Sequence, residues 1–260
     1  MKVDLENRVA LVTGAARGIG QAIADLLAEN GAHVYYSDVD AAEVRRSAAR
    51  KATSVPVEMD VCNEQQVQAV VDRIVGEQGH LDILINNAGV NTMRHRVPID
   101  QFPHDEWDRI VQIDLTGLYV VSRIVSGTMR AQKWGRIVNI ASVVGLVPLR
   151  LQCAFAAAKA GVINLTKAMA LELGADGITV NVVAPGSILT EGTKQLFYGD
   201  DGLFRQSVQQ LLAHVPLGRP GTVIEVANSV LFLVAPESSY VHGAVLTVDG
   251  GWTAGSAREF

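Results

Sequence analysis

The sequence contains few cysteines, no excess of positive charge and no long apolar run. Its two cysteines, Cys62 and Cys153, have neither a CxxC nor a metal-site spacing, so both are expected to be reduced thiols and no metal site is predicted. The 22 basic and 27 acidic residues are interspersed and give a net charge of -5. A nucleic-acid or anionic-membrane partner requires a basic face, so neither is expected. No segment reaches the roughly 18 apolar residues of a membrane span.

What the chain does contain is apolar residues in short blocks. Hydrophobic residues make up 48% of the 260 residues and charged residues 19%, which is enough to build a sizeable core. The start "MKVDLENRVALVTG" has no long apolar stretch before its first turn, so a signal peptide is not expected. These features predict a soluble, cytoplasmic protein with one large domain over residues 1–260.

Short β-branched segments alternate with helical patterns along the whole chain. The strands are expected at residues 8–13, 33–38, 55–60, 81–86, 135–141, 178–184 and 244–249. The helical stretches between them include 20–30, 64–78, 106–132 and 156–174. Nearly continuous apolar strands are typical of a parallel sheet covered on both faces. The alternation therefore predicts an α/β fold: a doubly wound, Rossmann-type parallel seven-stranded sheet with helices on both faces.

One stretch, from Pro185 to about Pro220, has no clear strand pattern. It mixes turn residues with scattered bulky apolar residues. An insertion of this kind beside a doubly wound sheet is more often a lid or substrate wall than a disordered linker. A substrate lid is predicted at about 187–214.

The segment "VTGAARGIGQAIADLL" places Gly14, Gly18 and Gly20 directly after the first strand and at the start of a helix. Glycines allow a tight turn and let the backbone approach a pyrophosphate, whose charge the helix N-terminus favours. A glycine triplet alone is also compatible with an ordinary strand–helix turn. Its position after the first strand favours a dinucleotide site.

The second strand ends at Asp38, eighteen residues after Gly20. A carboxylate there can accept hydrogen bonds from a ribose diol and would repel a 2′-phosphate, which favours NAD over NADP. Asp38 could instead cap the next helix, although Asp40 is also available for that role. Arg17, a basic residue in the glycine loop, is the feature that could favour NADP.

Further landmarks follow in a fixed order: "TGAARGIG" (13–20), Asp60-Val61, "NNAG" (86–89), Ser142, Lys159, Pro185-Gly186 and "VDGG" (248–251). As a set, these motifs resemble the short-chain dehydrogenase/reductase family over essentially the whole chain. The resemblance implies hydride transfer between a nicotinamide and a carbonyl or alcohol carbon. It also implies cofactor contacts from Gly14, Arg17, Gly18, Ile19, Gly20, Asp38, Asp60, Val61, Asn87, Ala88, Gly89, Lys159, Pro185, Gly186, Ile188 and Thr190.

The resemblance also implies catalytic roles. Ser142 matches the serine that polarises the substrate oxygen, and Lys159 matches the lysine that lowers the pKa of a catalytic tyrosine. The tyrosine position, thirteen residues after Ser142, holds Phe155, which has no proton to give. The position of the relay asparagine holds Asp114, which can accept a hydrogen bond but, when ionised, cannot donate one. Near Lys159 it could form an ion pair.

Three hypotheses account for Phe155. It could be a deliberate replacement of tyrosine by phenylalanine, which keeps the ring and deletes the acid. The chain could be a natural homologue that binds NAD without turnover. Another group could supply the proton, with His95 and His214 as candidates by residue type alone. Because the cofactor motifs, Ser142 and Lys159 are intact and in register, the first hypothesis is favoured.

The predicted substrate walls carry polar residues. The segment after Ser142 contributes Arg150 and Gln152, and the loop after "NNAG" contributes Asn91, Arg94, His95 and Arg96. These side chains favour a polyol, a sugar or a small anionic hydroxy compound over a purely hydrocarbon substrate. The basic residues of the loop could equally form a solvated face. Reduction of 3-oxoacyl thioesters is the alternative activity, against which Asp38 weighs, since biosynthetic reductases usually draw on NADP.

The two longest helical stretches carry more apolar residues than one face against the sheet requires. The residues concerned are Ile110, Ile113, Leu118, Val121 and Ile124 on the first, and Phe155, Val162, Leu165, Met169 and Leu173 on the second. Helices that are apolar over more than one stripe need a second burial surface. A homotetramer is predicted on this ground, and the family resemblance points the same way.

Overall fold

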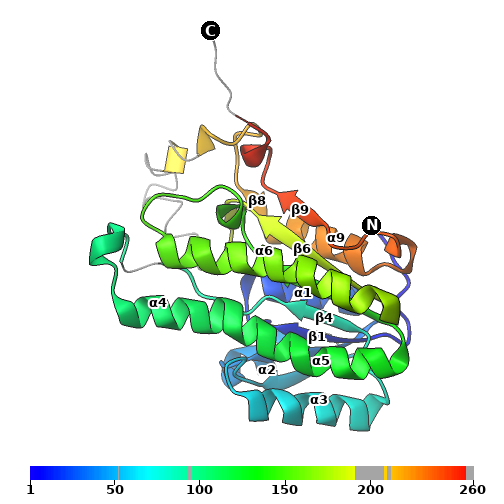
Figure 1. Cartoon of the computed structure of the whole chain (residues 1–260). Helices are drawn as coiled ribbons and strands as arrows, with labels where there is room; N and C mark the ends of the chain where they lie inside the picture. Colours follow the sequence, from blue (N-terminus) through cyan, green and yellow to red (C-terminus); the bar gives the residue numbers. More distant parts are fainter. Residues whose placement is uncertain (52, 93–94, 191–207, 210–211, 256–260) are drawn as a thin grey trace.

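The computed structural model describes residues 1–51, 53–92, 95–190, 208–209 and 212–255. A seven-stranded parallel sheet forms the centre, with strand order β3-β2-β1-β4-β5-β6-β9 (Figure 1). The strands are β1 (Val9–Thr13), β2 (His33–Asp38), β3 (Ser54–Glu58), β4 (Ile83–Asn86), β5 (Gly135–Ile140), β6 (Ile178–Pro185) and β9 (Val245–Val248). The predicted doubly wound α/β fold is confirmed, with a strand in each of the seven expected segments.

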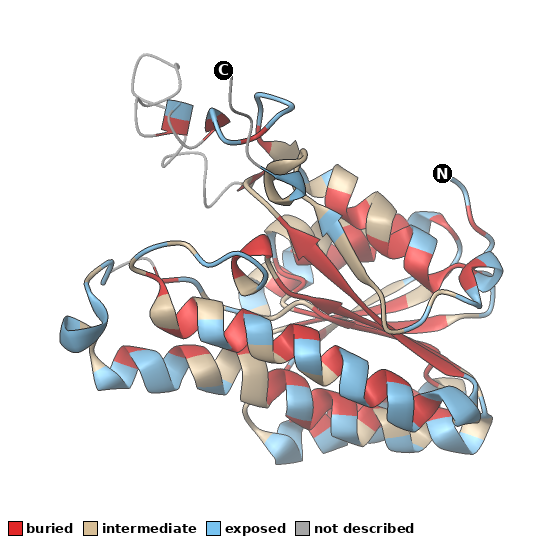
Figure 2. Ribbon diagram, turned by 45° about the horizontal axis from the view of Figure 1, so that its top comes forward, coloured by how far each residue is buried: buried red, intermediate tan, exposed pale blue. Residues whose placement is uncertain are grey.

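Helices cover both faces of this sheet. On one face lie α1 (Gly18–Glu29), α2 (Ala41–Ala48) and α9 (Val223–Val234), whose apolar residues share one core cluster with β1 and β2. On the other face lie α3 (Glu64–Gln78), α4 (His104–Val111), α5 (Leu118–Gln132) and α6 (Cys153–Leu173). Figure 2 shows the buried strands in the centre and the exposed outer sides of the helices.

Between α4 and α5 the backbone does not stay α-helical. Residues Gln112–Gly117 form a π-helical segment, so the helical run His104–Gln132 is continuous but locally widened. That run is long and apolar enough by composition to cross a membrane. Its residues Val121, Val125 and Met129 are nevertheless fully buried in the core cluster shared with β1 and β4, which identifies the run as a core helix.

The strands β7 (Ile188–Leu189) and β8 (Gly221–Thr222) form a separate two-stranded parallel pair. They flank most of the predicted lid. Residues 191–207 and 210–211 lie outside the described part of the chain, so the lid stays a prediction. Thr222 then begins α9 with a capping box, in which its hydroxyl accepts from the Glu225 backbone and the Glu225 carboxylate accepts from the Thr222 backbone.

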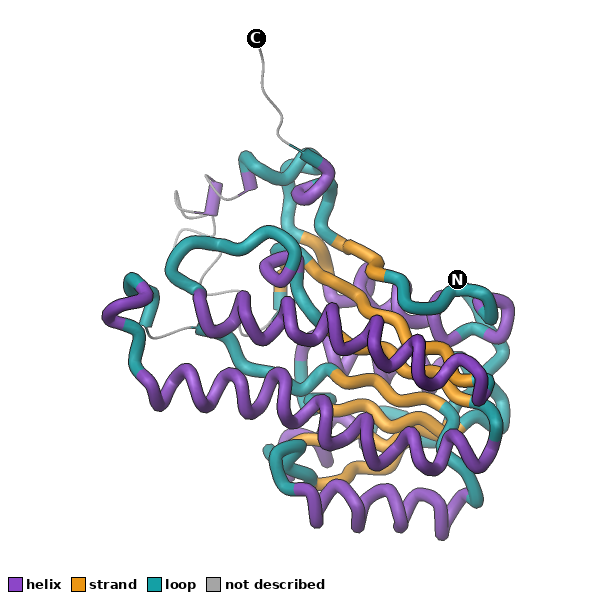
Figure 3. Tube along the Cα trace, viewed as in Figure 1, coloured by secondary structure: helices purple, strands orange, loops and turns teal. Residues whose placement is uncertain are grey.

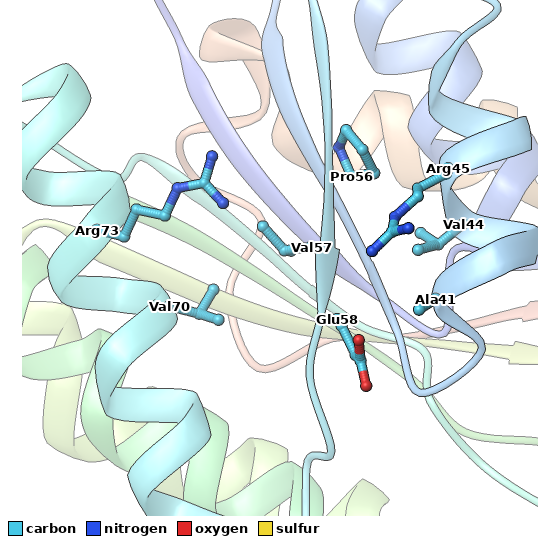
Figure 4. A pocket seen from close by; sticks show the side chains of 8 residues that line it. All are labelled: Ala41, Val44, Arg45, Pro56, Val57, Glu58, Val70 and Arg73. Atoms are coloured by element: carbon cyan, nitrogen blue, oxygen red, sulfur yellow. The ribbon is translucent and has the colours of Figure 1, made fainter.

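The outer edge of the sheet, β3, is protected from pairing with another strand. Pro56 in its centre has no N–H to offer. Arg45 of α2 and Arg73 of α3 lie on opposite sides of the strand, along a cavity of about 220 Å³ (Figure 4). None of the residues that line this cavity belongs to the predicted site, so no chemistry is assigned to it.

Candidate active site

The residues predicted from the motifs gather at the carboxyl edge of the sheet. The chain runs from β1 outward to β3 and then returns to build β4, β5, β6 and β9 on the other side. This reversal leaves a crevice between the carboxyl ends of β1 and β4, which is where open α/β sheets bind ligands. Gly14 follows β1 and Asn87 follows β4, so these two motifs flank the crevice.

The glycine loop is held against the end of β4 by close backbone contacts. The side-chain amide of Asn87 donates to the backbone carbonyl oxygens of Thr13 and Gly14, both at 3.0 Å. Gly14 has a positive φ, and a Cβ there would lie 2.8 Å from the Ala88 Cα. A Cβ on Gly20 would lie 2.2 Å from the Gly14 carbonyl oxygen. No larger residue fits either position without moving the loop.

Helix α1 begins at Gly18, and its N-cap residue, Arg17, makes no capping hydrogen bond with its side chain. Within the described part of the chain there is space in front of Gly18: of the described atoms, a Cβ built there would meet those of the Thr190 side chain, the nearest at 3.7 Å. Uncapped N–H groups that open into space at a helix N-terminus form an anion site. The geometry therefore fits the pyrophosphate of a dinucleotide.

Asp38 stands at the end of β2, beside this loop. Its two carboxylate oxygens accept from the backbone N–H of Ala16, at 3.1 Å, and of Asp40, at 3.0 Å. Each oxygen keeps capacity to accept from a ribose hydroxyl. Arg17 is engaged elsewhere: its guanidinium pairs with Asp40 at 2.7 Å, and Asp40 also caps α2 by accepting from Glu43.

The loop after β3 carries the predicted adenine residues. The Asp60 carboxylate accepts from the Cys62 backbone N–H at 2.9 Å, and Val61 is buried against Gly117, where a Cβ would lie 2.7 Å from a Val61 methyl group. Burial raises the pKa of the Cys62 thiol to about 11, and the carboxylates of Asp60 and Asp114 add to that rise.

Lys159 and Asp114 form a buried ion pair at the reaction end of the crevice. The Lys159 Nζ lies 3.0 Å from Asp114 Oδ2, and the two side chains are 7% and 0% exposed. Lys159 also donates to the Ile140 carbonyl at 3.2 Å, and the other oxygen of Asp114 accepts from the Val90 N–H at 2.7 Å. Asp114 lies within the π-helical segment, a distortion that is frequent at functional sites.

Phe155 lies one turn before Lys159 on α6 and is 9% exposed. The Lys159 Nζ is 5.6 Å from the centre of its ring. The ring packs in an apolar cluster with Ile110 and Val144, and it carries no polar atom. The Ser142 hydroxyl lies 3.5 Å from the Pro185 carbonyl, so the serine after β5 and the turn after β6 are brought together.

The predicted substrate residues are distributed unevenly. Gln152 is buried directly before α6, whereas Arg150 and Asn91 are exposed and Arg94 lies outside the described residues. Arg150 and Gln152 line a cavity of about 360 Å³. The loop before α6 arches over the start of that helix (Figure 3). Between Arg150 and Gln152, Leu151 has a φ of 65°, an unusual backbone for a leucine that fixes how its two neighbours project.

The two histidines proposed as alternative acids differ. His214 is exposed on a turn, and among the described residues no contact joins it to the site. His95 binds the carboxylate of Glu106 through Nδ1, and that carboxylate is 7% exposed. Glu106 precedes Ile110 by one turn of α4, and Ile110 packs with Phe155. His95 is therefore on the same side of α4 as the reaction end.

Two features of the site were not predicted. Thr13 holds the end of β4, because its hydroxyl accepts from the N–H groups of Asn87 and Ala88, each at 3.0 Å. A buried polar chain joins Asn86, Asn139 and Thr166 through hydrogen bonds of 2.9 Å. An asparagine inside an apolar strand is a sequence signal for such a network, since its buried amide needs a hydrogen-bond partner.

Comparison with known proteins agrees with this geometry. The family model described as enoyl-(acyl carrier protein) reductase matches residues 14–253. A 3-oxoacyl-(acyl-carrier-protein) reductase of Vibrio cholerae is 41% identical over 250 residues, covering 96% of this chain and 98% of the relative. Cyclopentanol dehydrogenase of a Comamonas species is 39% identical over 257 residues, covering 96% and 98%.

Among solved structures, levodione reductase superposes with a TM-score of 0.89 at 35% identity, covering 96% of this chain and 99% of that one. The likeness therefore extends over the sheet, the crevice and the helices on both faces. The relatives are oxidoreductases that act on alcohols or ketones by name, and they match nearly their full length. The chain belongs to the short-chain dehydrogenase/reductase family.

Proposed function

We propose that this chain is an NAD-dependent oxidoreductase that acts on a secondary alcohol or ketone, and that phenylalanine at position 155 impairs its turnover. The observation that carries this proposal is the continuous line of contacts from the glycine loop to Lys159. It runs through Gly14, Asn87 and the Gly89 turn, which lies against the Lys159–Asp114 pair.

The preference for NAD is supported by the pairing of Arg17. Its guanidinium is paired with Asp40 at 2.7 Å, while the Asp38 carboxylate accepts from the Ala16 N–H of the glycine loop. A 2′-phosphate would therefore approach a carboxylate whose basic neighbour is already neutralised. NADH is expected to bind more tightly than NADPH; equal or tighter binding of NADPH in a fluorescence titration would contradict this.

The residues at the reaction end divide the chemistry among them. NAD, when bound, supplies the hydride acceptor, and the uncapped start of α1 is suited to hold its pyrophosphate. The Ser142 hydroxyl is suited to orient the substrate oxygen, and Lys159 to donate to a cofactor ribose. No group on the Phe155 ring can take or give the substrate proton, so the slow step is expected to be proton transfer.

The substrate is proposed to be a polyol, a sugar or a small anionic hydroxy compound. Support comes from Arg150 and Gln152, which line the cavity beside α6. Reduction of 3-oxoacyl thioesters is a second candidate, favoured by the 41% identity to a reductase of that name. A third candidate, of another class, is an NAD-binding scaffold without turnover, favoured by the absence of a hydroxyl at position 155.

One experiment separates these candidates. The parent chain and Phe155→Tyr are titrated with NADH and then assayed with polyols, hydroxy acids and 3-oxoacyl thioesters. We expect both to bind NADH and Phe155→Tyr to turn over about 10²- to 10⁴-fold faster at its best pH. Phe232→Tyr is the matched control, since it adds the same hydroxyl on an exposed part of α9.

Two other outcomes have defined meanings. Tight NADH binding without turnover in either form supports the scaffold. A parent chain as fast as Phe155→Tyr means that another group supplies the proton, and His95→Gln then tests the imidazole that Glu106 holds.

A homotetramer in the cytoplasm is also proposed. The residues that now support the tetramer are not those that suggested it in the sequence. Seven of the ten named apolar side chains are already buried inside one chain, including Ile110, Val121 and Val162. The exposed ones on these helices are Trp107, Tyr119 and Leu171. Tyr119 borders a groove of about 390 Å³ between α5 and α6, which a second copy could cover. A monomeric mass by light scattering at micromolar concentration would remove this proposal.

A further inference from the structure

Lys159 is buried without the hydroxyl group that its family position implies, so its charge must be compensated in another way. Its ammonium group has the Asp114 carboxylate at 3.0 Å and the Ile140 carbonyl at 3.2 Å. The ring of Phe155, 5.6 Å away, provides only a weak attraction. An isolated buried ammonium is strongly disfavoured, so the carboxylate is the main reason that the lysine can stay charged here.

The position of Asp114 is fixed by its surroundings. One carboxylate oxygen accepts from the Val90 N–H at 2.7 Å, and the other faces Lys159. Gly89 allows this approach: a Cβ there would lie 3.0 Å from Asp114 Oδ2 and 3.3 Å from Lys159 Nζ. Asp114 lies in the wide turn of the π-helical segment, and its side chain is fully buried.

The charges that face this pair come from few elements. Among the described residues, helix α6 contributes Lys159 itself and the uncharged ring of Phe155, strand β5 contributes the Ile140 carbonyl, and the turn after β4 contributes the Val90 N–H. The loop after β3 contributes Cys62, whose thiol has a pKa of about 11 and is neutral at neutral pH. In the part of the chain that the structure describes, the positive charge of Lys159 is therefore balanced by the carboxylate of Asp114 alone.

We propose that Asp114 is a positioning residue matched to Phe155: its carboxylate neutralises Lys159, so the site holds cofactor and substrate without activating a proton donor. This inference rests on the proposed function. A lone ammonium favours the ionised form of a nearby phenol, whereas an ammonium already paired with a carboxylate does so far less. Restoring a hydroxyl at position 155 is therefore only half of what turnover at neutral pH requires.

Two departures that fit each other electrostatically also bear on how the chain arose. A single deliberate replacement at position 155 would leave no reason for a carboxylate at position 114. A matched pair favours a site that has changed as a unit toward binding without turnover.

The test compares Phe155→Tyr with Phe155→Tyr/Asp114→Asn in pH profiles of alcohol oxidation and in ultraviolet difference titrations against the parent. We expect the midpoint of the rising limb, in which the tyrosine loses its proton, to lie in Phe155→Tyr at least about one pH unit above that of the double variant. At pH 7 the double variant is then about tenfold faster or more. The matched control is Asp82→Asn in the Phe155→Tyr background. Asp82 is also a buried carboxylate, but it lies at the amino end of β4, away from the carboxyl ends of the strands. This control substitution should leave the midpoint unchanged.

Stability gives an independent readout. Asp114→Asn in the parent background should lower Tm, because it leaves Lys159 buried without its counter-charge. The added hydroxyl of Phe155→Tyr offers the ammonium a new partner, so the double variant should recover part of that loss. If Asp114→Asn alone is too unstable to purify, the double variant carries the comparison. A double variant that also fails to fold would overturn the proposal, since the hydroxyl would then not substitute for the carboxylate.

Failure of this inference is distinct from failure of the proposed function. Equal midpoints in Phe155→Tyr and the double variant, both active, would show that Asp114 does not act through Lys159. Absence of NADH binding in the parent chain would instead remove the proposed function. NADH binding without turnover in both variants at every pH would overturn the proposed match between Asp114 and Phe155 as well, since that match requires the double variant to be active.

Discussion

The two sides of the crevice differ in how closely they follow the family pattern. On the side of β1 and β2, the sequence keeps the residues of the family pattern, and the Asp38 carboxylate lies against the glycine loop at the Ala16 N–H. On the side of β5 and α6, two positions depart, Phe155 and Asp114, and both lie within reach of one lysine. The difference indicates that the residues proposed to bind the dinucleotide and those proposed to move a proton share Lys159 but can otherwise change independently.

The strongest way to test this separation is to break the binding side. Gly20→Val places a side chain where a Cβ already lies 2.2 Å from the Gly14 carbonyl oxygen. We expect NADH binding to weaken more than about 100-fold and the free energy of unfolding to fall by about 1–3 kcal/mol. Calorimetric titration and denaturant unfolding measure the two effects.

Gly76→Ala is the control for that change. A Cβ at Gly76, in α3, meets no atom of the described residues within 4 Å, and alanine is the better helix former. It should leave NADH binding unchanged and stabilise the chain slightly. Weak NADH binding in Gly76→Ala as well would mean that the loss is not specific to the loop.

A smaller effect is expected when only the charge beside the ribose site is removed. Asp38→Asn keeps an acceptor for the Ala16 N–H but deletes the negative charge. The ratio of NADPH to NADH affinity should rise by about tenfold, because the repulsion of the 2′-phosphate is relieved. Competition titrations of both dinucleotides measure the ratio. A constant ratio would show that Asp38 does not discriminate between them.

The next effect concerns α9, which packs on α1. Glu225→Gln weakens the capping box and the pair with Arg219, at a cost of about 1 kcal/mol in stability. The Arg219 guanidinium and the Thr222 N–H lower the pKa of Glu225 to about 2 from its ordinary 4.5.

Because the pKa is lowered in the folded chain, this contribution is fully present above about pH 4.5 and is lost as the pH falls toward 2. It is small, since the carboxylate is 39% exposed and screened. Thermal unfolding at pH 7 and pH 3 should therefore differ less in Glu225→Gln than in the parent. The turnover of Phe155→Tyr should be unaffected by the added change.

The smallest effect reports on the reaction side. The high pKa of Cys62, due to burial and then to Asp60 and Asp114, should make its alkylation slow at pH 8 and still rising at pH 10. Asp114→Asn removes one of the charges that raise this pKa, so alkylation at a fixed pH should become a few-fold faster. Mass spectrometry of the Cys62 peptide measures the rate. An unchanged rate would mean that the Asp114 charge does not reach the thiol.

The sequence predicted the sheet well because each strand is an apolar block between turn signals. It also placed Asp38 and Asn87, since parallel strands bring their carboxyl ends to one edge. The π-helical segment at Gln112–Gly117, in which Gly117 lies close to Val61, was not predicted, because its pattern is that of an ordinary helix. The pairing of β7 with β8 was also missed, since it joins two residues to two others some thirty positions away.

The apolar residues of the two long helices differ in another way between sequence and structure. Apolar residues such as Val121 and Val162 suggested a second burial surface, yet both are buried within one chain. A helix between a sheet and a neighbouring helix needs two apolar stripes without any partner chain. Only the structure separates that case from an outward-facing stripe, which here is marked by Tyr119 and Leu171.

The β7–β8 pair has a consequence for how this protein can change over evolutionary time. Ile188 pairs with Gly221 and Leu189 with Thr222, so the two ends of the segment at the substrate side are joined to each other. With its ends joined, doubling the length of such a segment adds only about 0.6 kcal/mol of closure entropy. Insertions and deletions between residues 190 and 220 should therefore be tolerated by the sheet, which leaves this segment free to diversify in length.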